Sequence, residues 1–95
     1  LEPRGTLTID PGAVKALRGG ASLLPVGVRA IEGSFSRGDA VVIRDPEGRV
    51  LGRGLVAYDS AEAGLIIGHP SARIPDVLNY PGRAWMVHRD DLALF

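Results

Sequence analysis

The residues that could take part in catalysis are few and scattered. His88-Arg89-Asp90 matches the start of a protein-kinase catalytic loop, but the sequence has no Asp-Phe-Gly and no glycine-rich phosphate loop to accompany it. His69 and His88 are the only histidines and cysteine is absent, whereas zinc normally takes at least three protein ligands. No serine lies in Gly-x-Ser-x-Gly, the nucleophile motif of many hydrolases. The sequence therefore predicts no catalytic residue, no cofactor-binding residue and no metal site.

The basic residues are candidates for phosphate contacts, because arginine binds phosphate in a bidentate manner. Eleven basic residues balance eleven acidic ones, and Lys15 is the only lysine. Four arginines could form a patch if they shared one face, but three acidic residues are interspersed with them: Arg37, Arg44, Arg49 and Arg53, with Asp39, Asp45 and Glu47. This pattern indicates a mixed, solvated surface and weighs against strong nucleic-acid binding, which needs clustered positive charge.

The elements that must position these residues are short. Thirteen glycines and seven prolines separate brief apolar runs, which is typical of many strands joined by tight turns. Strands are expected at residues 6–9, 26–31, 40–43, 50–58 and 84–88, and helices at 11–18, from Asp59 to near Gly68, and at 71–78. In the strand at 26–31, Val26, Val28 and Ala30 should share one side. Gly52 and Gly54 should mark a bulge or bend.

This order predicts an α/β mixed, mainly β domain: a pseudobarrel of about five or six strands with two or three short helices. Its length allows one domain with a modest core. No apolar run approaches the ~20 residues that span a bilayer, and no signal peptide is visible. The sequence also lacks an initiator methionine. We therefore expect a cytoplasmic segment of a longer protein, with no membrane partner.

Several motifs resemble the C-terminal PUA domain of bacterial glutamate 5-kinases, and the resemblance covers nearly the whole chain. The segments that carry it are Gly-Thr-Leu-Thr-Ile-Asp at 5–10, Ser-Leu-Leu-Pro-Val-Gly-Val at 22–28, Gly-Ser-Phe-Ser-Arg-Gly-Asp at 33–39, Tyr-Asp-Ser at 58–60, Ile-Gly-His at 67–69 and Ala-Trp-Met-Val-His-Arg-Asp-Asp at 84–91. The resemblance implies that residues 1–4 are a linker from an upstream domain and that residues 5–95 form the PUA domain.

The resemblance also implies a parent enzyme that transfers the γ-phosphoryl group of ATP to L-glutamate, with Mg²⁺, in the first step of proline biosynthesis. Such parents are cytosolic oligomers, are inhibited by proline, and hold their catalytic residues in an upstream amino-acid kinase domain. This fragment is then an accessory domain with a regulatory or assembly role. A free-standing enzyme has no support in the sequence.

RNA binding is the alternative function, because other PUA domains dock structured RNA such as tRNA. The resemblance places RNA on the loop after the first helix and on the last strand. There the backbone amides of the two glycines could approach phosphates, and the arginines could neutralise them. The candidate residues are Arg18, Gly19, Gly20, Ser22, Leu23, Leu24, Arg83, Trp85, His88 and Arg89. This hypothesis predicts that Arg18, Arg83 and Arg89 converge on one face.

Overall fold

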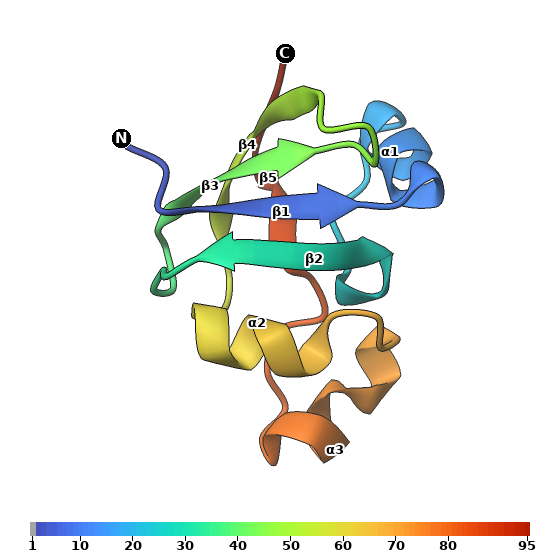
Figure 1. The fold of residues 1–95 in the computed structure, drawn as a ribbon. Coiled ribbons are helices and arrows are strands. Elements are labelled where there is room, and N and C mark those ends of the chain that lie inside the picture. Colours follow the sequence, from blue (N-terminus) through green and yellow to red (C-terminus); the bar gives the residue numbers. More distant parts are fainter. Residues whose placement is uncertain (1) are drawn as a thin grey trace.

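A five-stranded mixed sheet organises the chain in the computed structural model, which describes residues 2–95 (Figure 1). The strand order is β2-β1-β3-β4-β5, with β1 and β3 parallel and every other neighbouring pair antiparallel. The elements in chain order are β1 (Gly5–Ile9), α1 (Pro11–Arg18), a 3₁₀ turn (Pro25–Gly27), β2 (Val28–Gly33), β3 (Ala40–Arg44), β4 (Val50–Val56), α2 (Ser60–Ile66), a second 3₁₀ turn (Ser71–Arg73), α3 (Ile74–Leu78) and β5 (Val87–Leu94). The expected mainly β architecture is confirmed.

The core collects apolar side chains from the strands, the helices and the loops that join them. In Figure 1 the sheet curls so that β5 passes behind β1 and β2, while α2 and α3 gather beyond β2. The residues with almost no exposed surface are Leu7, Ile9, Leu23, Val28, Val41, Ile43, Val56, Tyr58, Ala63, Ile66, Ile74, Met86 and Val87. Burial of these side chains is the main force that holds the short elements together.

The first two predicted helix starts are confirmed, and each uses an aspartate as its N-cap. The Asp10 side chain accepts a hydrogen bond of 2.7 Å from the amide of Ala13, and Asp59 accepts one of 2.8 Å from the amide of Glu62. Each bond satisfies an amide that has no partner within its own helix. The second cap fixes α2 and therefore the position of Glu62, which becomes important below.

The strand expected at residues 26–31 begins later than predicted. Pro25–Gly27 forms a 3₁₀ turn, and β2 starts at Val28. A side chain at Gly27 would lie 2.6 Å from the β-carbon of Ala13, so this turn packs tightly against α1. Val26 consequently faces solvent with 48% of its surface exposed, and Ala30 is exposed as well. The prediction that Val26, Val28 and Ala30 share one side is wrong, because Val26 lies in the turn and Val28 is buried whereas Ala30 is exposed.

The last strand is also displaced from its predicted place. The prediction put it at residues 84–88, whereas β5 runs over Val87–Leu94 and leaves Trp85 in the preceding segment. The polar run Arg89-Asp90-Asp91 lacks the apolar alternation that predicts a strand, because β5 lies at the sheet edge and exposes these side chains. The strand expected over 50–58 is shorter than predicted and ends at Val56.

Gly52 and Gly54 let β5 approach β4 closely. A β-carbon on Gly52 would lie 2.2 Å from the carbonyl oxygen of Ala93, and one on Gly54 would lie 2.5 Å from a methyl group of Val87. The predicted bulge is confirmed next to Gly54, since the register between β4 and β5 shifts between Gly54 and Val56.

The structure describes only residues 2–4 of the expected linker, because Leu1 lies outside the described residues. Arg4 belongs to the sheet region already: its amide donates a 2.8 Å hydrogen bond to the carbonyl of Ala40. No helix in residues 2–95 is long and apolar enough to cross a membrane.

Candidate binding sites beside the last strand

The loop after α1 lies alongside β5, so the two regions expected to bind RNA are neighbours. Leu23 forms an isolated antiparallel bridge with Val87, and its amide donates a 2.9 Å hydrogen bond to the Val87 carbonyl. The amide of Arg89 donates a 2.8 Å bond to the Ser22 hydroxyl oxygen. At the far end, the Arg18 guanidinium donates a 3.4 Å bond to the carbonyl of Phe95. We call residues 18–24 together with residues 87–95 the loop edge.

The three arginines predicted to converge are spread out. Arg18 contacts the C-terminal end of β5, Arg89 lies beside Ser22, and Arg83 lies before the strand begins, over the ring of Trp85. Because β5 contains eight residues, its ends are separated by roughly 25 Å. A ligand that reached all three arginines would have to extend along the whole strand.

The amides of Gly19 and Gly20 are engaged within the chain. Gly19 donates to the carbonyls of Lys15 and Ala16, each at 3.1 Å, and Gly20 donates to Leu17 at 3.0 Å. These bonds close the C-terminal end of α1, where the helix dipole is negative and disfavours anions. The expectation that both amides approach phosphates therefore does not fit this geometry.

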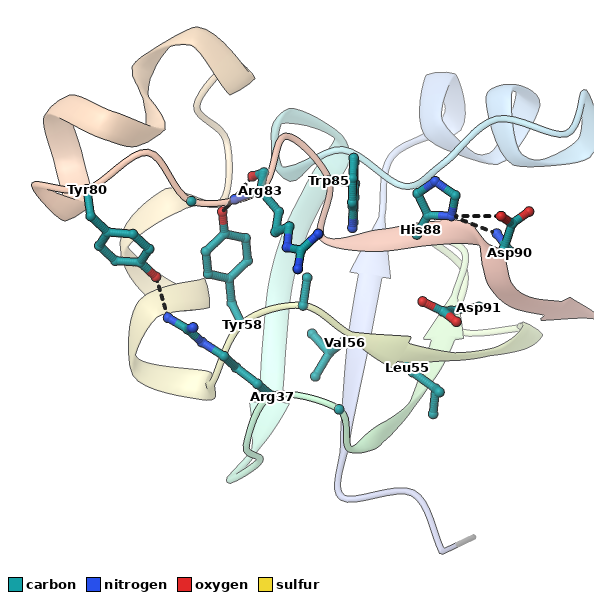
Figure 2. Close-up of a pocket in the computed structure, with 13 residues that line it drawn as sticks. Arg37, Leu55, Val56, Tyr58, Tyr80, Arg83, Trp85, His88, Asp90 and Asp91 are labelled. Atoms are coloured by element: carbon teal, nitrogen blue, oxygen red, sulfur yellow. Dashed lines mark hydrogen bonds and ion pairs between the residues drawn. The ribbon is translucent and has the colours of Figure 1, made fainter.

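A separate cavity of about 740 Å³ opens on the other side of β5 (Figure 2). Its walls are the turn at Arg37, the end of β4, the segment 80–85 and the start of β5. Three of the predicted residues line it: Arg83, Trp85 and His88. Of the other predicted residues, Ser22, Leu23 and Leu24 border a smaller, apolar hollow of about 280 Å³ against α1.

The bulge in β5 forms one rim of the cavity. Val56 pairs with Val87 and Gly54 pairs with Leu92. The two paired positions are therefore five residues apart in β5 but only two residues apart in β4. The extra residues bow outward, and the His88 ring nitrogen Nδ1 accepts a 3.1 Å hydrogen bond from the amide of Asp90 within the bow. The bulge thereby brings His88 and Asp91 to the cavity.

Tyr58 holds the segment 80–85 against the body of the domain. Its ring is 1% exposed, and its hydroxyl group both donates to the Arg83 carbonyl and accepts from the Arg83 amide. Gly82 takes a left-handed backbone conformation with φ of 62°, and a β-carbon there would lie 2.5 Å from the Tyr58 hydroxyl oxygen. The main chain of Arg83 is thus fixed, although its side chain is exposed.

A three-residue ionic cluster closes one end of the cavity. Arg37 pairs with Glu62 at 2.9 Å, and the Tyr80 hydroxyl group donates to the same carboxylate. The hydrogen bond from Arg37 is the main cause that lowers the pKa of Glu62, and the bond from Tyr80 lowers it further. Burial, reinforced by the bond to Glu62, raises the pKa of Tyr80 to about 12. The cluster is mutually satisfied and joins α2 to the segment after α3.

Trp85 lies between two polar side chains at the centre of the cavity. Figure 2 shows its ring between the side chain of Arg83 and the ring of His88. The Arg83 guanidinium carbon is 5.8 Å from the ring centroid, and the His88 ring meets it edge-on with centroids 4.6 Å apart. This is the geometry of a cation–π contact combined with an aromatic T-shaped pair.

Sequence reasoning missed three cavity residues, Tyr58, Tyr80 and Asp91, along with Glu62 beside the cavity, and it suggested Arg37 only as a phosphate contact. The partners are distant in the sequence: Arg37 precedes Glu62 by 25 residues, and Tyr58 precedes Arg83 by 25. Residues 2–95 contain no group of three His, Cys, Asp or Glu residues that could hold a metal ion. The cavity supplies charged and aromatic groups for binding, without a paired nucleophile and base.

Comparison with known proteins gives a consistent result. A model of the family described as "PUA domain" matches residues 5–78. The chain is 58% identical over 94 residues to glutamate 5-kinases of Rhodopseudomonas palustris (strain TIE-1) and Gluconobacter oxydans (strain 621H). The match covers 99% of this chain and 25% of either relative, so the chain spans about a quarter of their length.

Among solved structures, a PUA domain from Aeropyrum pernix K1, crystallised as a tartrate complex, is similar at 32% identity with a TM-score of 0.64. The similarity covers 90% of this chain and 43% of that one.

Proposed function

This chain belongs to the PUA domain family, and we propose that it is an accessory domain of a glutamate 5-kinase with a regulatory or assembly role. The observation that carries the proposal is the high identity with such enzymes over nearly the whole chain. The sequence adds a balance of basic and acidic residues, and the described residues contain no group of three His, Cys, Asp or Glu that could hold a metal ion, which suits a domain that assists a catalytic domain elsewhere.

The parent in this proposal phosphorylates L-glutamate with ATP and Mg²⁺, in the cytoplasm, as part of proline biosynthesis. Its catalytic residues belong to an upstream amino-acid kinase domain, to which residues 1–4 form the linker. Homo-oligomer formation through the parent is part of the same proposal. Each of these properties is part of the proposal and follows from the resemblance to glutamate 5-kinases, because this chain spans only a quarter of the length of such relatives.

Deletion of residues 5–95 from the full-length protein tests the proposed role. We expect the truncated enzyme to keep phosphoryl transfer and to change in oligomeric state or in inhibition by proline. Circular dichroism and size-exclusion chromatography establish that the truncated protein is folded. A folded truncated enzyme that has lost all catalysis would contradict an accessory role.

RNA binding is the second candidate function, and the loop edge is the observation that favours it. Its exposed arginines, Arg18 and Arg89, lie on adjacent segments that could follow a phosphate backbone. Titration of this chain with bulk tRNA at increasing salt tests the idea. Affinity that falls with a slope of roughly two or more released counterions, and that is lost on charge reversal of Arg18 and Arg89, supports RNA binding. Absence of binding at low salt excludes it.

A further inference from the structure

The cavity beside β5 contains two opposite charges that have no protein partner. Among the described residues, the Arg83 guanidinium makes only its contact with the Trp85 ring, and the Asp91 carboxylate makes no hydrogen bond or ion pair. In Figure 2 the Asp91 carboxylate is turned toward the cavity. The two groups line the same cavity without pairing with each other. A ligand that brought one anionic and one cationic group could satisfy both.

The cavity is poorly suited to a nucleic acid strand. The Trp85 ring already contacts Arg83 and His88, so a base that stacked on it would have to compete with these two side chains. Asp90 and Asp91 stand together at the rim and would repel a phosphate backbone. The Arg37 charge is compensated by Glu62 and adds little attraction for phosphate.

The spacing of the two free charges fits an extended peptide. Val87 and Leu92 pair with β4 residues that are only two positions apart, so the start of β5 and the Asp91 end of the bulge are separated by about 7 Å along the strand direction. Arg83 reaches back over Trp85 from before the strand. An extended peptide advances about 3.3–3.6 Å per residue, so three residues cover roughly 10 Å. The end of β4 adds Leu55, Val56 and Ala57 to the cavity wall, which offer apolar contacts.

We propose that this cavity binds an extended polypeptide segment that carries an acidic side chain against Arg83 and a basic side chain against Asp91, about three residues apart. The Arg83–carboxylate contact can be bidentate, because no protein group occupies the guanidinium donors. The inference stands apart from the proposed kinase role, since it depends only on the cavity.

The test uses this 95-residue chain and capped peptides. The probe is acetyl-Glu-Gly-Gly-Lys-amide, together with the same peptide in reverse order, and either Glu or Lys is replaced by Gln in the control peptides. Trp85 is the only tryptophan, so its fluorescence reports binding at this cavity. Backbone amide shifts in two-dimensional NMR provide a second readout, which is needed because Arg83 itself contacts the fluorophore.

We expect one charge order to give saturable binding in the millimolar range, centred on His88 and Asp91. Each Gln-containing control peptide should bind about threefold more weakly or worse. Arg83→Gln should lower the affinity for the Glu-containing peptide until it equals the affinity for the Gln-Gly-Gly-Lys control. Asp91→Asn should do the same for the lysine end. Arg49→Gln and Glu47→Gln, both on the exposed β3–β4 turn, are the matched control variants and should bind as the original chain does.

Several results would overturn the proposal. One is the absence of saturable shifts for either charge order at about 20 mM peptide, a concentration that detects even millimolar affinity. Another is equal binding of the charged and Gln-substituted peptides, or binding unaffected by both Arg83→Gln and Asp91→Asn. A third is displacement of the peptide by single-stranded RNA with stronger RNA binding in Asp91→Asn, which would assign the cavity to phosphate.

Discussion

The two ends of the cavity beside β5 differ in how their charges are satisfied. At one end Arg37, Glu62 and Tyr80 satisfy one another and join two elements, α2 and the segment after α3. At the other end Arg83 and Asp91 face the same space without a partner. Both ends are rich in charge, yet only the first contributes to holding the fold. Charged residues in a cavity therefore indicate a binding role only when their own partners are missing.

Arg83 shows the same difference within one residue: its main chain has protein partners, whereas its guanidinium has no hydrogen-bond partner among the described residues. Tyr58 fixes the Arg83 peptide group by two hydrogen bonds, whereas its guanidinium extends freely over Trp85. A fixed backbone with a free side chain is the arrangement that a recognition site needs, because the position is set before a ligand arrives. The substitutions below test this division, in order of decreasing expected effect on stability.

Tyr58→Phe should give the largest loss of stability. It removes the hydroxyl group but keeps the ring in the core, and it leaves the amide and carbonyl of Arg83 without their partner. We expect the free energy of unfolding in urea to fall by about 2 kcal/mol. Tyr80→Phe is the control, since its hydroxyl belongs to a half-exposed ionic cluster and should cost less. Equal losses in the two variants would contradict the structural role given to Tyr58.

Glu62→Gln should have a smaller and pH-dependent effect. Arg37 and Tyr80 lower the pKa of Glu62 in the folded state below its ordinary value of 4.5, so the folded protein holds this proton more weakly than the unfolded chain does. The stabilisation is therefore complete above pH 4.5 and is lost as the pH falls through the folded pKa. Urea unfolding from pH 6 down to about pH 3 should show a shallower decline for Glu62→Gln than for the original chain.

The exposed Glu47 provides the control for that measurement, because its side chain has no partner among the described residues. Glu47→Gln should leave the decline unchanged. An unchanged decline in Glu62→Gln would show that the cluster with Arg37 does not stabilise the fold.

Much of the fold could be predicted from local sequence patterns, whereas the cavity could not. The N-caps at Asp10 and Asp59 and the alternation in β1 depend on neighbouring residues, so the sequence contains their full signal. The contact of Arg37 with Tyr80 spans 43 residues and depends on how α2 and α3 pack. No local pattern encodes such a contact.

The predicted binding site is correct in one respect and wrong in another. The adjacency of residues 18–24 and β5 is present, but Arg83 and Trp85 lie on a different surface from Arg18. Arg83 and Trp85 precede β5, and Tyr58 holds the main chain of Arg83, whereas Arg18 contacts the C-terminal end of the strand. The bulge opposite Gly54 adds His88 and Asp91 to the cavity. A glycine in a strand predicts a bulge, but it does not indicate which side chains the bulge brings together.

Arg83→Gln should have the smallest effect on stability and a clear effect on recognition. The backbone bonds to Tyr58 do not involve the side chain, and an exposed cation–π contact with Trp85 contributes about 0.5 kcal/mol. Urea unfolding should therefore differ from the original chain by no more than that amount, while the charged peptide loses affinity. A loss of stability comparable to that of Tyr58→Phe would mean that the guanidinium helps to hold the fold, and the distinction between the two ends of the cavity would fail.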